Sequence, residues 1–405
     1  MIRTVKSTAT ARWLLLWVGL CAGAAVQAQT LQEAVQAAWA RTPQAAALAS
    51  RQVEAQAASE LAGNLTPGPP SLSVSNYSDR LYRNTGSYEW ELELATPLWL
   101  PGQRQAREAV AGKAATELDA KNKTLRLQLA AEVREAWWSL AYAQDAAALA
   151  QQRLASAKAL EDSVQRRFKA GELARLDANM AQSETLSAES ESLAADAGLQ
   201  QVQHAWRSLV GLPPPAVLGA EAVQTSADMT NHPQLRNLQA AAELARSRLS
   251  LVDASGREAP ELSLRWSTQR AEYGAAPSQI LGFKLTVPFS SQTRRRQEEA
   301  AARAEIEHAE AELAVAQSRL ELDLQKTQAE LNLTGRQLSL AANRRTLADD
   351  SLQLARCAFT LGESDLATFL RARAAALEAE TQFRRQQTAR NQALSRLYQA
   401  QGNMP

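Results

Sequence analysis

Two stretches without proline limit the fold of this chain more than any other feature. Residues 102–212 contain no proline, and neither do residues 289–404. Proline interrupts helices because it lacks a backbone N–H and its ring clashes with the preceding turn. A glycine lies near the middle of each stretch, at Gly171 and Gly362. These stretches therefore predict two long helices, each of which turns back on itself as a helical hairpin.

Short motifs recur at a nearly constant spacing, which indicates an internal duplication. The motif "FKAGE" at 168–172 resembles "FTLGE" at 359–363, which lies 191 residues later. The motif "PSLSV" at 70–74 resembles "PELSL" at 260–264, and here the spacing is 190. One residue of extra length therefore lies between these motifs in the second copy. The pattern predicts two repeats, residues 29–215 and 216–405, after a leader of residues 1–28.

Both repeats show the same predicted order of elements. A first helix covers about 30–63 and again about 230–255, and a β-hairpin follows at 70–97 and 260–288. A helix of roughly 65 residues then leads to the glycine turn, at 168–172 and 359–363, and a helix of roughly 40 residues returns. At 1.5 Å per residue the longer helix reaches about 100 Å, which exceeds an ordinary globular domain.

The predicted hairpins alternate apolar and polar residues, so each strand has two different faces. The apolar face carries Tyr88, Trp90, Leu92, Trp266 and Phe283, and the polar face carries Glu89, Glu91, Glu93, Arg265 and Lys284. Two explanations fit this pattern. The sheet packs its apolar face on a helix of a soluble protein, or it meets lipid as part of a β-barrel built from several copies. Alternation alone does not decide between them.

The N-terminus has the pattern of a secretory signal peptide. Basic residues precede the apolar run at 13–26, and small residues at 26–28 predict cleavage after Ala28. An uncleaved anchor is the weaker alternative, because this run is too short to span a bilayer comfortably. Leu20 is too bulky for a lipoprotein signal at Cys21. Cys357 would then be the single cysteine of the exported chain, so we expect no internal disulfide.

At this point the chain resembles the TolC family of outer-membrane efflux proteins, in the branch that serves heavy-metal and drug pumps. The resemblance covers nearly all of the exported chain. It rests on the duplication, on the paired hairpin openings, on "TPLWLPGQR" at 96–104 before the first long helix, and on the two glycine turns. The implied fold is mainly α with a β-barrel contribution: a trimer with a twelve-stranded outer-membrane barrel and a long periplasmic α-helical barrel.

The resemblance also implies partners and sites. A homotrimer would span the outer membrane and extend into the periplasm of a Gram-negative bacterium, as the passive exit duct of a tripartite efflux pump. Its cargo would be metal ions or small toxic compounds. The tips would dock a periplasmic adaptor, which connects to an inner-membrane pump, through Phe168, Gly171, Glu172, Phe359, Gly362 and Glu363. The apolar strand face named above would meet lipid, and the polar face would line the lumen.

The entrance gate is where the sequence departs from the family. Several members close the entrance with aspartates shortly after the second glycine turn, where this chain has Thr368 and Arg371. Asp365, or Asp177 in the first repeat, could form an acidic ring that attracts cations. Solvated tip carboxylates are the plain alternative, so we carry Asp177, Asp365, Thr368 and Arg371 forward as candidates.

No residues point to an enzyme. The three histidines have no partner at metal-ligand spacing, and no nucleophile–base pair or phosphate-binding glycine loop occurs. We therefore expect no catalytic residues, no metal site and no cofactor, and the formal charge of +1 gives no sign of nucleic-acid binding. The alternatives to an efflux duct are a type I protein-secretion exit duct and a periplasmic coiled-coil adaptor or scaffold.

Overall fold

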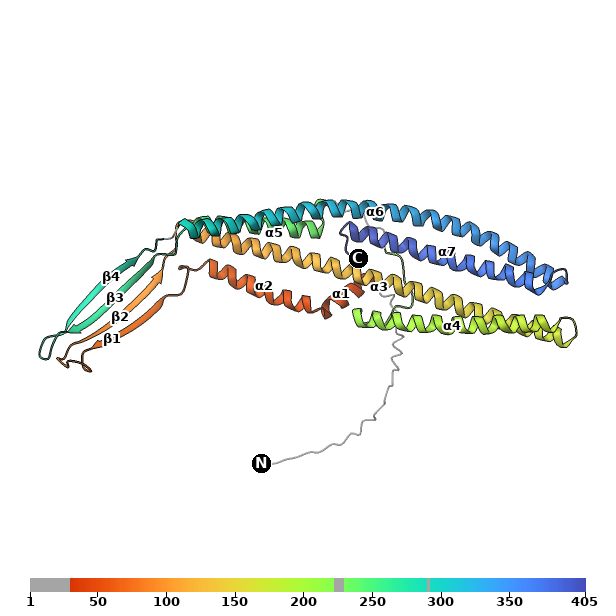
Figure 1. Ribbon diagram of the computed structural model, residues 1–405, viewed down its shortest axis with the longest axis horizontal. Helices are drawn as coiled ribbons and strands as arrows, with labels where there is room; N and C mark the ends of the chain where they lie inside the picture. Colours follow the sequence, from red (N-terminus) through yellow and green to blue (C-terminus); the bar gives the residue numbers. More distant parts are fainter. Residues whose placement is uncertain (1–29, 222–228, 290–291) are drawn as a thin grey trace, which may run out of the picture.

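The same order of elements occurs twice along an elongated molecule that carries a β-sheet at one end (Figure 1). The computed structural model describes residues 30–221, 229–289 and 292–405. The expected leader, with its cleavage site and Cys21, lies outside them. The first half contains α1 (Leu31–Arg41), α2 (Pro43–Ala62), β1 (Ser71–Ser78), β2 (Tyr88–Pro97), α3 (Gln103–Lys169) and α4 (Arg175–Val210). The second contains η1 (Met229–Asn231), α5 (Pro233–Ala254), β3 (Glu261–Arg270), β4 (Ser278–Thr286), α6 (Gln292–Leu361) and α7 (Leu366–Ala400).

The helix lengths agree with the sequence pattern except near the N-terminus. The long helices α3 and α6 have 67 and 70 residues, and the returning helices α4 and α7 have 36 and 35. The single helix expected over about 30–63 is instead two helices, α1 and α2, which meet at Thr42. Proline disfavours the helical conformation of the residue before it, and Thr42 accordingly has an extended backbone with φ −73° and ψ 132° ahead of Pro43.

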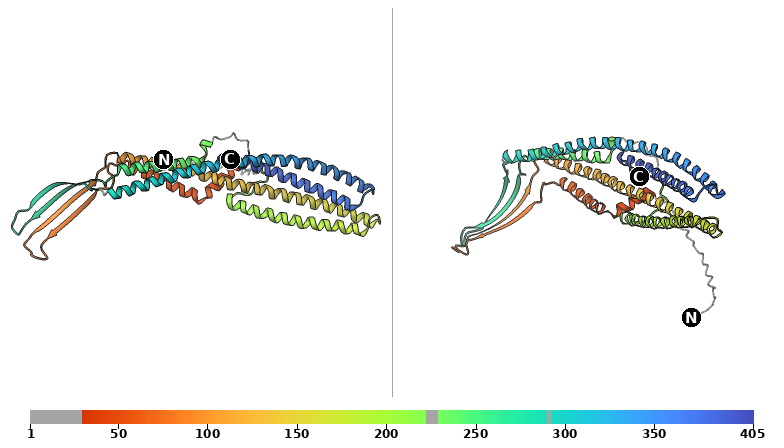
Figure 2. Two further views of the ribbon diagram at one scale, coloured as in Figure 1. Left: turned by 45° about the horizontal axis from the view of Figure 1, so that its top comes forward. Right: turned by 45° about the vertical axis from the view of Figure 1, so that its right-hand side comes forward.

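The long helices lie side by side in the order α4, α3, α7, α6, so α4 and α6 are the two outer helices of the layer (Figures 1 and 2). The strands form one antiparallel sheet in the order β1-β2-β3-β4. Its central pair, β2 with β3, joins the two halves of the chain. Ser71 pairs with Ala95 in one hairpin, and Glu261 pairs with Thr286 in the other. These registers repeat the 190- and 191-residue spacings and place the extra residue in the β3–β4 turn.

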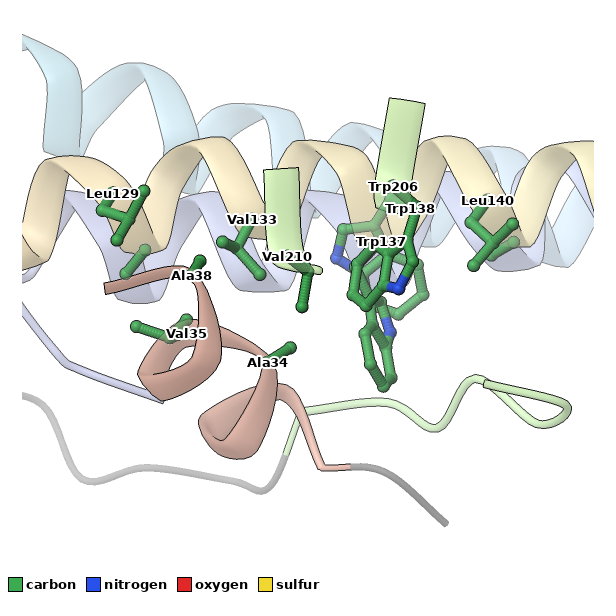
Figure 3. Close-up of a cluster of buried hydrophobic side chains, with 12 residues drawn as sticks. Ala34, Val35, Ala38, Leu129, Val133, Trp137, Trp138, Leu140, Trp206 and Val210 are labelled. Carbon is green, nitrogen blue, oxygen red and sulfur yellow. The ribbon is translucent and has the colours of Figure 1, made fainter. Parts of the chain in front are cut away.

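A cluster of buried apolar side chains fixes α1 and the end of α4 against the middle of α3 (Figure 3). Trp137 of α3 and Trp206 of α4 lie with their ring centroids 5.8 Å apart, and Trp206 is fully buried. The neighbouring Trp138 donates a hydrogen bond from Nε1 to Ser395 Oγ of α7 at 3.0 Å. Three helices are thus joined within one turn of α3.

A buried arginine joins segments that lie far apart in the sequence. Arg134 of α3 is 3% exposed and pairs with Glu221, which follows α4 and whose side chain is 5% exposed. Its Nε donates to Glu221 Oε2 at 3.2 Å, and its Nη2 donates to the carbonyl of Asn403 at 3.1 Å. Gln399 of α7 accepts a further hydrogen bond from Nη1. Arg134 therefore attaches two other segments to α3. They are the connection between the two halves of the chain and the end of α7.

The cap of α5 makes stability depend on pH. His232 is 4% exposed, and its Nδ1 accepts a hydrogen bond from the backbone N–H of Gln234 at 3.2 Å. Burial lowers the pKa of His232, so the folded chain favours the neutral ring. The stability that the neutral ring contributes is complete above the unfolded pKa near 6.5, and it is lost as pH falls below that value. We expect the free energy of unfolding to decrease below pH 6.5, by at most about 1.4 kcal/mol per pH unit.

The measurement is urea unfolding at a series of pH values from about 7.5 to 5. His232→Asn keeps a side chain that caps helices well but does not titrate, so its profile should be flatter over this range. His204 and His308 are exposed and serve as matched sites for the same substitution. Equal slopes in the parent and in His232→Asn would contradict the assignment.

Candidate functional site

The two faces of the sheet carry the residues that the sequence assigned to them. Trp90, Leu92, Trp266 and Phe283 lie on one face, between 39% and 78% exposed. In the ladders Leu92 lies opposite Trp266, which lies opposite Leu281. Tyr88 is on the same face, but the guanidinium of Arg270 covers its ring at 4.8 Å. An exposed apolar surface of this extent is typical of contact with lipid or with another protein.

The opposite face carries ion pairs between strands: two between the neighbouring strands β2 and β3, and one from β4 to β2 across β3. Arg265 of β3 contacts Glu91 of β2 at 2.9 Å and Glu89 at 3.2 Å, and Lys284 of β4 lies 3.9 Å from Glu93. Because β2 and β3 belong to different halves of the chain, these pairs connect the two hairpins. The alternation thus brings the five predicted polar residues onto one charged face.

The two glycine turns lie at the end of the molecule away from the sheet and have the same geometry (Figure 1). Gly171 and Gly362 have φ values of 82° and 79°, a left-handed conformation that glycine adopts without steric cost. The N–H groups of Glu172 and Glu363 each donate at 2.9 Å to the carbonyl five residues earlier, so both turns close in the same way.

An aromatic cluster packs the two turns against each other. Phe359 is 8% exposed and stacks on Phe369 with ring centroids 5.4 Å apart. Arg167 of α3 lies over the Phe359 ring at 5.2 Å and also contacts Glu172 at 3.1 Å, while Phe168 packs at the edge of the cluster. Of the six residues predicted for docking, the two glycines and two glutamates are exposed, whereas Phe359 is buried.

The two aspartates among the candidate gate residues accept backbone hydrogen bonds at the starts of α7 and α4 in this structure. Asp365 accepts a hydrogen bond from the backbone N–H of Thr368 at 3.0 Å and begins α7. Asp177 accepts from the backbone N–H of Ala174 at 3.2 Å at the start of α4. Hydrogen bonds from the Thr368 side chain and backbone lower the pKa of the Asp365 carboxyl. Arg371 Nη2 donates to Thr368 Oγ1 at 2.9 Å, so three of the four candidates form one group.

Sequence patterns did not reveal a buried arginine that links the two helical hairpins. Arg373 of α7 is 7% exposed, and its Nη2 donates to Ser156 Oγ of α3 at 2.6 Å. Burial lowers its pKa, and nearby Glu184 opposes that effect. The two partners are 217 positions apart in the sequence, and no local pattern connects them.

Two negative findings apply to the part of the chain that the structure describes. None of its helices combines the length and the apolar character needed to cross a membrane. Within the same ranges, no group of three or more His, Cys, Asp or Glu side chains gathers where it could hold a metal ion.

Comparison with known proteins finds a family that matches the first half of the chain. Residues 20–212 match the family described as outer membrane efflux protein. This match supports an exit duct for efflux in the outer membrane that extends into the periplasm, as the resemblance to TolC implied. No curated protein matches the chain.

Solved structures show the same fold at low sequence identity. The outer membrane protein VceC of Vibrio cholerae is 16% identical with a TM-score of 0.74, covering 92% of this chain and 96% of VceC. A membrane protein of Pseudomonas aeruginosa is 19% identical with a TM-score of 0.73, covering 92% and 90%. The open state of the MtrE channel of Neisseria gonorrhoeae is 17% identical with a TM-score of 0.73, covering 92% and 89%. These comparisons confirm the mainly helical fold, which the chain shares with these solved structures.

Proposed function

We propose that three copies of this outer membrane efflux protein form the exit duct of a tripartite pump, which passes metal ions or small toxic compounds. The sheet is the observation that carries this proposal. Four strands cannot close into a barrel, and β1 and β4 are its edge strands. Joining β4 of each copy to β1 of the next would pair both edges and give twelve strands. The apolar face would then meet lipid, and the ion-paired face would line water.

The exposed part of the turns is the proposed docking surface for a periplasmic adaptor that connects to an inner-membrane pump. Gly171, Glu172, Gly362 and Glu363 offer backbone and carboxylate groups to a partner. Phe168 and Phe359 support this surface from beneath, because the aromatic cluster keeps the two turns together. The exposed residues would contact the partner, and the two phenylalanines would hold the turns in place. This assignment follows from their burial and refines the set of six residues predicted from sequence.

The oligomeric state is the first experiment. The protein is extracted in detergent from the outer-membrane fraction, and its mass is determined by light scattering with the detergent contribution subtracted. We expect three chains per particle and, in planar bilayers, ion conductance through the purified particle. A monomer or dimer recovered from the soluble periplasmic fraction would overturn the proposal and favour a scaffold.

A charge at the entrance is tested by two substitutions at Asp365. Asparagine caps a helix nearly as well as aspartate, whereas alanine does not. We expect Asp365→Asn to move the reversal potential in a salt gradient towards zero, because a ring of carboxylates is lost. Asp365→Ala should produce the same change and also loosen the start of α7.

The matched control is Asp350→Asn, an exposed acid on α6 about 18 Å along the helix from the turn. It should leave the reversal potential nearly unchanged. If Asp365→Asn retains the parent value and only Asp365→Ala alters the channel, Asp365 acts as a cap and the acidic gate is wrong.

A further inference from the structure

A cleft opens at the junction where the strands end and the long helices begin. Its walls come from the residues that precede α3, from the end of α5 and the connection after it, and from the stretch between β4 and the first turn of α6. Its volume is about 450 Å³, and its charged lining residues are Arg257 and Arg295. The apolar part of the lining includes Leu100, Pro288 and Phe289. The cleft therefore combines positive charge with apolar surface.

Both arginines have hydrogen-bond donors that the protein does not use. The exposed side chain of Arg257 makes no ion pair or hydrogen bond with any residue that the structure describes. Arg295 contacts Glu299 at 2.8 Å through Nε, and neither of its Nη groups has a partner in the described ranges. A Cβ atom at Gly256 would lie 3.8 Å from Arg295 Cζ, so this guanidinium lies beside the residue that precedes Arg257. Planar guanidinium groups with free N–H groups match the oxygens of a phosphate.

Phe289 gives the cleft an apolar side that continues the sheet. It is 95% exposed, and it follows β4, whose Leu281, Phe283 and Leu285 are between 59% and 78% exposed on the apolar face. Apolar side chains at this exposure cost free energy in water, and aromatic side chains are common where a membrane-spanning segment reaches the water. The cleft therefore lies at the end of the surface that would meet lipid.

The corresponding junction in the first half is closed by the chain itself. Subtracting 191 from Arg295 gives Arg104, whose Nη2 donates to the carbonyl of Gly63 at 2.8 Å. That carbonyl belongs to the connection over 63–70, which leads from α2 to β1. The connection from α5 to β3 covers only 255–260, and none of its carbonyls accepts a hydrogen bond from Arg295. The donors of Arg295 are thus left for a group outside the chain.

A run of arginines makes the start of α6 more basic than the start of α3. Residues 294–296 are three arginines, whereas the equivalent residues 103–105 are one arginine between two glutamines. Positive charge at the start of a helix opposes its dipole, and α6 has no acidic residue in its first turn. The acidic partners of the run, Glu298 and Glu299, lie one turn further along α6. An anion bound at the first turn would offset this unfavourable charge.

We infer that the cleft binds the phosphate of an anionic phospholipid, with Arg257 and Arg295 donating to its oxygens and an acyl chain lying along Phe289. This site rests on the proposed function, because a sheet that crosses the outer membrane brings the junction to the level of the lipid headgroups. Basic pockets at that level are typical sites for anionic lipids. The apolar side of the cleft favours a lipid over free phosphate, since free phosphate has no group to place against Phe289.

Native mass spectrometry of the full chain, extracted in a neutral detergent, tests the site. Phosphatidylglycerol and phosphatidylcholine are added at equal concentration, because both carry a phosphate but only the first has a net negative charge. We expect the parent to retain phosphatidylglycerol in preference. The double variant Arg257→Gln with Arg295→Gln should bind that lipid about tenfold more weakly. The preference of the parent should also decrease as the salt concentration is raised.

The matched control removes two arginines from the part of the molecule that lies away from the sheet. Arg356→Gln with Arg390→Gln changes exposed residues of α6 and α7, and Arg356 lies about 90 Å along α6 from Arg295. Lipid binding by this control should equal that of the parent. Phe289→Ser keeps both arginines, so it should weaken the binding of both lipids and leave the preference for the anionic one. Should the arginine double variant lose the parent's circular dichroism or mass, the salt dependence of the parent decides.

The outcomes distinguish the lipid site from the proposed function. The site would be overturned by equal retention of both lipids at every salt concentration, by unchanged retention in the arginine double variant, or by displacement of the lipid with inorganic phosphate at the same concentration. Equal retention is also the result if a neighbouring copy covers the cleft. In each case a conducting particle of three chains would leave the duct intact. A monomer from the soluble periplasmic fraction would instead overturn the duct, whatever lipid the chain retains.

Discussion

Replacing Arg134 with alanine is expected to lower the free energy of unfolding by about 3–5 kcal/mol, because it leaves a buried carboxylate without its partner. Glu221 is buried together with Arg134. The substitution also removes the donors to Gln399 and to the carbonyl of Asn403. Urea unfolding of the detergent-solubilised protein, followed by far-UV circular dichroism, measures this loss.

A double variant separates the ion pair from the other contacts of Arg134. Arg134→Met combined with Glu221→Gln removes both charges and keeps an apolar side chain in place of the Arg134 stem and the shape of Glu221, so we expect it to recover part of the loss. Lys123→Ala is the matched control, because Lys123 and Asp119 form an exposed pair on the same helix, 66% and 61% exposed. Such pairs contribute less than about 1 kcal/mol. A loss for Arg134→Ala no larger than that of Lys123→Ala would contradict the prediction.

Trp206→Ala is expected to cost about 3–5 kcal/mol, the usual range for removing a large aromatic side chain from a core. Trp206 is fully buried and packs on Trp137 and Val210 within the cluster around α1 (Figure 3). The same unfolding measurement applies. Because α4 begins at the tip and ends in this cluster, we also expect greater proteolytic sensitivity at the end of α4.

Trp206→Phe tests whether the indole nitrogen matters. Trp206 Nε1 is buried and has no hydrogen-bond partner among the described residues, so phenylalanine removes an unsatisfied donor while keeping most of the apolar surface. We expect its cost to be clearly smaller than that of alanine. Equal costs for the two variants would mean that the apolar surface kept by phenylalanine contributes nothing to stability, and this would contradict the prediction.

Local sequence signals predicted the long elements and their turns. Gly171 and Gly362 were identifiable because a chain reversal between two long helices needs a residue that tolerates positive φ. The two faces of the sheet followed from period-two alternation, which is a geometric property of any strand. The break between α1 and α2 was equally local. The prediction of a single helix over about 30–63 overlooked the effect of Pro43 on the backbone of Thr42.

These local patterns could not predict contacts between residues that lie far apart in the sequence. Arg134 meets Asn403 across 269 positions, and Arg373 meets Ser156 across 217. Their positions in amphipathic helices give no sign that they are buried. Asp365 is a different case. Its place after the glycine turn suggested a gate, but aspartate at the first position before a helix commonly accepts a backbone hydrogen bond, and that is the role seen here.

The β2–β3 ladder has a consequence for how the chain is made. Arg265 and Glu89, which it brings together, are 176 positions apart, so the centre of the sheet forms only after β3, which ends at Arg270, has been synthesised and exported. Until then the first hairpin exposes apolar side chains and an unpaired strand, and such intermediates aggregate readily. Contacts of this sequence separation also form slowly. The fold thus leaves an interval during synthesis in which the first hairpin is present without the strand that completes the centre of its sheet.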